Sequence, residues 1–231
     1  MLVSIFNDVI GPVMRGPSSS HCAAALRIGR LAHDLMGGEL DEVLVEFDRK
    51  GSLPTTHDTQ GSDMGLVGGL MGWDAADERL PGSPQALRDL GVQIRIETVD
   101  AGDPHPNTYR LTLRHGEERH FVRAISTGGG MMEVINVDGF KVSMFGDCFE
   151  TLLWVRREGH KLAQELATLV SADAILVHEV IETAQRVAGQ MPRELRCTAL
   201  GGLSITPTSL AIELRLAAKK AASCGSGCAC H

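Results

Sequence analysis

Apolar positions in the first part of the chain follow helical and strand periods in turn. A helical spacing covers about residues 22–36 and ends at a Gly-Gly pair, which favours a helix C-terminus. The apolar run at 43–47 is typical of a strand. Small and apolar residues over 64–73 predict a buried, closely packed helix, and a proline near its start predicts a short helix over 84–90.

A series of strand candidates follows these helices. Their connections contain Gly, Asn or Asp, as hairpin turns require. The candidates are 93–99, 109–113, 120–126, 131–136 and 140–145. Helices followed by such a meander predict an α+β domain, with a mostly antiparallel sheet and helices packed on one face.

The pattern becomes helical again near Thr151. Helical spacing of apolar residues continues to about Gly189, and a further helix is expected over 209–222 after a proline. The sequence therefore predicts one domain over 1–150, a helical segment over 151–222, and a cysteine-rich flexible tail over 223–231. A helical turn is also expected at 4–10.

Composition narrows the functional classes. The net charge of −7 argues against nucleic acid or acidic membranes as partners, and no apolar run is long enough for a membrane span. The first residues lack a basic leader, so we expect no signal peptide. Six cysteines, three of them crowded near the end, indicate thiol or metal chemistry in a reducing cytoplasm rather than a disulfide framework.

Three serines and a histidine precede the first long helix. Ser18, Ser19, Ser20 and His21 lie where a helix N-terminus presents unpaired N–H groups and the positive end of its dipole. An ordinary serine N-cap is the alternative, but one cap needs a single serine. The excess of hydroxyls favours an anion site.

Four polar, glycine-punctuated segments lie at the ends of predicted elements, where loops can converge. They are 16–22, 51–63, 105–108 and 126–130. Their hydroxyls, amides and histidines suit a small zwitterion or hydroxy acid better than a nucleotide. Gly128–Gly130 alone also fits a simple hairpin turn, and Asp63 fits a helix cap as well as a binding role. His115 and His120 flank a predicted turn and are expected in solvent.

Cysteines at the end of the chain offer soft metal ligands. Cys224, Cys228 and Cys230 match no standard zinc or ferredoxin spacing, although three thiolates suffice for an iron–sulfur cluster with an open iron. An adventitiously metal-binding, disordered terminus is the alternative reading of this spacing.

The four segments, in this order, resemble the beta chain of iron–sulfur-dependent L-serine dehydratases. The family motif G-P-S-S-S-H-T corresponds to residues 16–22, with Cys22 in place of Thr. Residues 105–108 match its H-P-N-T, and 126–130 match its S-x-G-G-G. Residues 192–208 are similar to the end of the same enzyme's alpha chain.

The resemblance implies a carbon–nitrogen lyase that converts L-serine into pyruvate and ammonia with a [4Fe–4S] cluster. It implies proton transfer by His21, with His57 as a further candidate, and a cluster on the tail thiols or on a partner alpha chain in a homo- or hetero-oligomer. The residues expected to bind or orient L-serine are Ser18, Ser19, Ser20, Asn107, Thr108, Ser126, Gly128 and Gly129.

Two departures from the family, Gln60 and the missing body of the alpha chain, keep a second hypothesis open, and residues 151–190, which join two regions normally far apart, motivate a third. The family usually has G-H-G-T-D where this chain has Gln60, and glutamine cannot act as a base. The chain is therefore also consistent with a non-catalytic module that binds a small amino acid or hydroxy acid. An internally deleted remnant without stable function is the third hypothesis.

Overall fold

A computed structural model describes residues 13–14, 16–147, 149–155, 159–169, 172–179, 195–197, 203–205 and 210–216. The chain forms two compact units, residues 1–147 and residues 148–231. The candidate site lies in the first unit.

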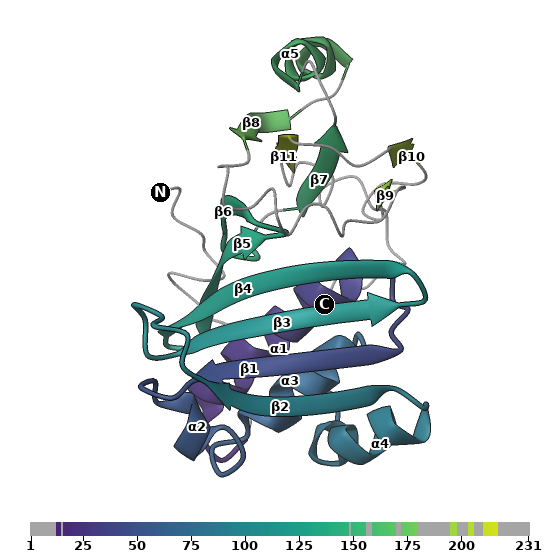
Figure 1. The fold of residues 1–231 in the computed structure, drawn as a ribbon. Coiled ribbons are helices and arrows are strands. Elements are labelled where there is room, and N and C mark those ends of the chain that lie inside the picture. The colour runs from purple at the N-terminus through teal and green to yellow at the C-terminus, as the bar shows by residue number, and fades with distance from the viewer. Residues whose placement is uncertain are drawn as a thin grey trace. The chain divides into compact units, whose positions relative to one another are not determined.

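The first unit is built on a six-stranded sheet in the order β2-β1-β3-β4-β5-β6 (Figure 1). β1 and β2 pair in parallel, and the other neighbours are antiparallel. The strands are β1 (Glu42–Asp48), β2 (Gln93–Val99), β3 (Thr108–His115), β4 (Glu118–Gly128), β5 (Met131–Val137) and β6 (Phe140–Met144).

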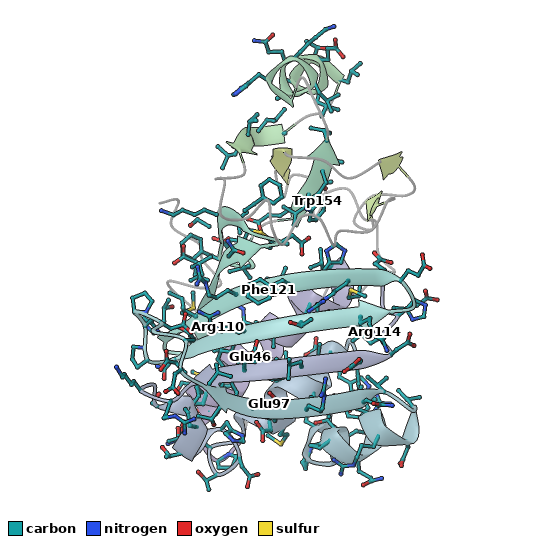
Figure 2. The ribbon with its side chains drawn as sticks, in the orientation of Figure 1. Glu46, Glu97, Arg110, Arg114, Phe121 and Trp154 are labelled. Carbon is teal, nitrogen blue, oxygen red and sulfur yellow. The ribbon has the colours of Figure 1, made fainter. Side chains whose placement is uncertain are left out.

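Helices cover one face of this sheet (Figure 1). They are α1 (Ser19–Leu35), α3 (Ser62–Leu70) and α4 (Ser83–Asp89), with short turns of helix at α2 (Leu53–Thr56) and Leu80–Gly82. Figure 2 shows charged side chains on the opposite face, among them Glu46 and Glu97 from β1 and β2 and Arg110 and Arg114 from β3. The side chains that alternate with these form the core beneath the helices, where Phe47 and Tyr109 meet edge to face with ring centroids 5.5 Å apart.

Glycines let α1 and α3 pack backbone to backbone. A Cβ at Gly65 would lie 2.2 Å from the carbonyl oxygen of Cys22, and one at Gly69 would lie 2.1 Å from that of Leu26. Because Cys22 precedes Leu26 as Gly65 precedes Gly69, the two helices run in parallel. Their N-termini therefore lie at the same end of the unit.

The structure confirms the α+β fold and the helices and strands predicted for this unit. The predicted strands correspond to β1–β6, and the predicted helices to α1, α3 and α4, with ends shifted by a few residues. The sheet is mostly antiparallel, as predicted, and β2 joins its edge through the one parallel pairing among these six strands.

The second unit corrects the predicted helical segment over 151–222. Its strands β7, β11 and β8 form an antiparallel sheet in that order, and β9 pairs with β10. The elements are β7 (Phe149–Val155), α5 (Gly159–Leu169), β8 (Ala172–Glu179), β9 (Leu195–Cys197), β10 (Leu203–Ile205) and β11 (Leu210–Leu216).

Only α5 follows the predicted helix among these elements. Residues 210–216 read Leu-Ala-Ile-Glu-Leu-Arg-Leu, and a large aliphatic residue at every second position is the strand period. The predicted turn at 4–10 and the predicted tail 223–231 lie outside the described residues. Among the described helices, none is long and apolar enough to cross a membrane.

Candidate functional site

Backbone hydrogen bonds bring the four polar segments together. The Ser18 N–H donates to the Gln60 carbonyl at 3.2 Å, which joins the first segment to the second. The Ser52 N–H donates to the Pro106 carbonyl at 2.9 Å, which joins the second to the third. The Ser126 N–H donates to the Asn107 carbonyl at 3.0 Å and adds the fourth. The predicted convergence of distant loops is present in this structure.

The start of α1 is not an ordinary serine cap. Ser18 occupies the N-cap position, but its hydroxyl makes no capping hydrogen bond. Ser18 Oγ instead lies 2.8 Å from His21 Nδ1. Ser19 is exposed, while Ser20 and His21 are half-buried. The first-turn N–H groups, which have no acceptor within the helix, are therefore available to an anion together with the hydroxyls of Ser19 and Ser20.

The start of α3 lies beside the start of α1. Gly61 is its N-cap with φ of 78°, and a Cβ there would come within 2.8 Å of Pro17 Cδ. Glycine is thus needed for the backbone conformation and for the close approach of the two loops. Since the helices are parallel, the positive ends of both dipoles act on the same region.

His57 and Asp63 form a histidine–carboxylate pair at this end. His57 Nδ1 lies 2.8 Å from both carboxylate oxygens of Asp63, and the imidazole packs against Phe47 with ring centroids 5.2 Å apart. Burial raises the pKa of the Asp63 carboxyl, and His57 opposes that rise. The Nδ1–H donor leaves Nε2 of a neutral imidazole as a proton acceptor. Gly61 is the N-cap of α3 and the Asp63 carboxylate binds His57, so of the two interpretations left open for Asp63 the helix cap is wrong.

Local hydrogen bonds hold the loop from His105 to Thr108. The Asn107 N–H donates to His105 Nδ1 at 3.2 Å, and Thr108 Oγ1 donates to the His105 carbonyl at 2.7 Å. Thr108 is buried, so its hydroxyl braces the loop. The Ser52 hydroxyl donates to Asn107 Oδ1.

Three buried polar atoms near the start of α3 have no hydrogen-bond partner in the described part of the protein. They are Gln60 Oε1, Ser62 Oγ and the Tyr109 hydroxyl. Burial raises the pKa of Tyr109 to about 12, and the Ser62 hydroxyl opposes that rise, so these two hydroxyls lie beside each other although they do not meet hydrogen-bond geometry. Because buried polar groups are almost always satisfied, such a group of atoms indicates a place for water or a polar ligand.

The glycine-rich fourth segment forms the turn between β4 and β5. Gly128 and Gly129 have φ of 99° and 61°, and open space surrounds the position of a Cβ at either residue. The hairpin-turn interpretation is therefore confirmed. Ser126, which is buried, is the residue that connects this segment to Asn107. The predicted binding roles of the two glycines remain predictions.

The described residues do not form a site for an iron–sulfur cluster. Among them, no three His, Cys, Asp or Glu side chains are arranged to hold a metal ion. Cys22 is buried in the first turn of α1. The candidate ligands Cys224, Cys228 and Cys230 lie outside the described residues.

The prediction of His120 in solvent is wrong. Its side chain is fully buried, and Nδ1 lies 2.7 Å from Asp138 Oδ2. Burial lowers the pKa of His120, but Asp138 and then Glu118 outweigh burial and raise it to about 9. His120 points inward because it alternates with outward-facing Phe121 along β4.

Sequence analysis missed Asp48, and it gave Ser52 no role beyond its place in the segment 51–63. Asp48 is a buried carboxylate at the end of β1, and its oxygens accept N–H groups from Lys50 and Asp103. An acidic residue directly after an apolar strand and before a glycine loop is the signal that points to such a role.

The first unit is an α+β domain in which hydroxyl, amide and imidazole groups lie at two helix N-termini. Such an arrangement suits a site for a small polar molecule.

No family model matches the chain. Over 188 residues it is 35% identical to the probable L-serine dehydratase beta chain of Bacillus subtilis (strain 168), covering 81% of this chain and 83% of the relative. It is 34% identical over 149 residues to the L-serine dehydratase beta chain of Peptoniphilus asaccharolyticus, covering 63% and 65% of the two proteins. The chain belongs to the L-serine dehydratase beta-chain family.

Proposed function

We propose that this chain is the beta-type subunit of a lyase that converts L-serine into pyruvate and ammonia. The reaction breaks the Cα–H bond and the Cβ–O bond and releases water. The resulting 2-aminoacrylate tautomerises and is hydrolysed to pyruvate and ammonia. Family membership supports the reaction, and the polar site at the starts of α1 and α3 supports a small zwitterion as substrate.

The substrate carboxylate binds at the start of α1 in this proposal. Its ligands are the first-turn N–H groups, the hydroxyls of Ser19 and Ser20, and the side-chain NH2 group of Asn107. The uncapped helix start is the observation that carries this assignment, since a capped helix would have one fewer donor for an anion.

Two histidines move protons in this proposal. His57 removes the α-proton at Nε2, because Asp63 fixes the Nδ1–H tautomer and stabilises the imidazolium that forms. His21, hydrogen-bonded to Ser18, is the second proton-transfer group. His57 then fills the role that Gln60 cannot fill.

The cluster completes the enzyme from outside the described residues. We propose that a partner alpha chain supplies a [4Fe–4S] cluster, or that Cys224, Cys228 and Cys230 hold it. Such a cluster would supply a Lewis acid that assists departure of the substrate hydroxyl. A reducing cytoplasm, where thiols persist, is the compartment that suits it.

Anaerobic reconstitution tests this function. The full chain is purified alone and together with an alpha-chain-type protein encoded beside it. Both preparations receive iron and sulfide, and the pyruvate formed from L-serine is measured. Pyruvate in either preparation supports the proposal, and iron and sulfide counts show which chain holds the cluster. Absence of pyruvate in both preparations rejects it.

The substitution of Gln60 for the family histidine favours one competing function, a non-catalytic amino-acid-binding module. Calorimetry distinguishes the two. A binding module would bind L-serine, as measured by calorimetry, without forming pyruvate. The unmodified protein and His57→Gln would then both show only background levels of pyruvate.

A further inference from the structure

Ser52 controls which way the Asn107 carboxamide faces. The backbone of Asn107 is fixed on both sides, since its N–H donates to His105 Nδ1 and its carbonyl accepts from Ser126. The Ser52 hydroxyl donates to Oδ1 of the side chain, and the Pro106 carbonyl, 3.4 Å from Ser52 Oγ, is its more distant acceptor. A carboxamide whose oxygen is held by a donor turns its NH2 group, with two N–H donors, the other way.

Asp48 holds together the two loops that carry Ser52 and Asn107. The residue as a whole is 5% exposed. Oδ1 accepts the Lys50 N–H at 2.8 Å in the first loop, and Oδ2 accepts the Asp103 N–H at 2.7 Å in the second. These backbone hydrogen bonds lower the pKa of the Asp48 carboxyl, so it remains charged and keeps both loops bound at neutral pH.

One further contact anchors the second loop to β3, and another brings the two loops together. The carboxylate of Asp103 is almost fully buried and binds Arg110 through two hydrogen bonds of 2.7 and 2.8 Å. On the other side, a Cβ at Gly51 would lie 2.5 Å from the Pro106 carbonyl oxygen. The loops therefore meet at backbone distance directly beside Ser52.

We propose that Ser52 and Asp48 are positioning residues that present the NH2 group of Asn107 to the substrate carboxylate. Asp48 sets the distance between the loops, and Ser52 sets the orientation of the amide. The inference rests on the proposed function, in which Asn107 contacts L-serine.

A double-mutant cycle tests this role in the reconstituted full-length enzyme. We expect Ser52→Ala to raise KM for L-serine about tenfold and to change kcat by less than threefold. In an Asn107→Ala background, Ser52→Ala should then have no further effect on KM. Thr55→Ala is the matched control. The Thr55 hydroxyl is exposed on α2, directly after Ser52, and donates to the Ser52 carbonyl, so this variant should keep the KM of the unmodified enzyme.

The side-chain amide signal of Asn107 provides a readout that is independent of turnover. In the 15N-labelled full chain, assigned through Asn107→Ala, Ser52→Ala should shift this signal, and Thr55→Ala should not. An unshifted amide signal, or additive effects on KM in the cycle, would overturn the inference. If the unmodified enzyme forms no pyruvate, the proposed function fails, whereas the amide signal still reports whether Ser52 orients Asn107.

Discussion

At the scale of single residues, the site contains polar groups whose partners are already fixed. His57 is held by Asp63, Asn107 by Ser52, and His21 by Ser18. Each partner binds one polar atom of an imidazole or carboxamide. The other polar atom of that group then faces away from the partner. In our proposal, such preorganisation saves the cost of ordering these groups when L-serine binds.

The histidine–carboxylate pair makes a prediction about catalysis. His57→Gln should lower kcat by about 100-fold or more, because a positioned base contributes roughly that factor. Asp63→Asn should also lower kcat, since the amide favours the wrong imidazole tautomer. Steady-state kinetics of the reconstituted enzyme measure both effects. His115→Gln, at a half-exposed histidine of the β3–β4 turn, is the control and should keep the original kcat.

The buried His120 makes a prediction about stability and pH. Its pKa of about 9 in the folded chain lies above the ordinary unfolded value of about 6.5. Stabilisation by the His120–Asp138 pair is therefore complete below about pH 6.5 and is lost as the pH rises through 9. Over that range the free energy of unfolding should fall by up to about 1.4 kcal/mol per pH unit.

Denaturant unfolding of the unmodified protein and of His120→Gln, each between pH 6 and 10, measures this contribution. The variant should be less stable at pH 6, and its stability should depend less on pH. Parallel pH profiles of the two proteins would show that His120 is not charged in the folded state.

At the scale of elements, the parallel contact of α1 with α3 creates the candidate site. Antiparallel helices would place a negative helix end beside the start of α1. Glycines at the contact allow the parallel arrangement by bringing the helix backbones together. The cost of two adjacent positive helix ends is offset by the Asp63 carboxylate in the free protein, and in our proposal by the substrate carboxylate.

Gly65→Ala tests this contact. The new methyl group would press on the Cys22 carbonyl, so we expect a loss of about 1–3 kcal/mol in the free energy of unfolding, as for overpacked cores. Separation of the helix starts should also raise KM for L-serine. Chemical denaturation and kinetics measure the two effects.

Gly82→Ala is the matched control, because nothing lies within 4 Å of the position of a Cβ there and its φ is −93°. Its stability and KM should be unchanged. Equal effects of the two substitutions would contradict the importance of the helix contact.

Elements with clear periodicity could be predicted from the sequence, and their pairing could not. The strand at 93–99 and the helix at 62–70 are recognisable, but the parallel pairing of β2 with β1 depends on the intervening helices packing together. The sequence predicts helix at 172–179, where a short apolar run fits both periods, and the prediction of helix at 210–216 overlooks an alternation that is the strand period. Within the site, the motifs identified the loops, whereas Ser52 and Asp48 became visible only through the contacts between loops.

At the scale of the whole molecule, the chain combines a beta-chain domain with a second unit of strands and one described helix. The similarity to the Bacillus subtilis relative covers 81% of the chain and so includes more than the first unit. The similarity of residues 192–208 to the end of an alpha chain remains a prediction.

The tail cysteines make a prediction at this scale. If they hold the cluster, replacing Cys224, Cys228 and Cys230 together by alanine should remove iron and sulfide from the reconstituted chain and abolish its visible absorption. If the partner alpha chain holds it, the same replacement should leave the iron content of the complex unchanged. Iron and sulfide analysis under anaerobic conditions distinguishes these outcomes, and Cys22→Ala serves as the control thiol.

Hydrogen–deuterium exchange of the Ser19, Ser20 and His21 amides, measured in the reconstituted enzyme with and without L-serine, tests most directly whether the start of α1 binds the substrate. These N–H groups have no acceptor within the helix, so they should exchange fast without substrate and slow markedly when L-serine binds. Unchanged exchange in a preparation that produces pyruvate would place the substrate elsewhere and contradict the proposed site.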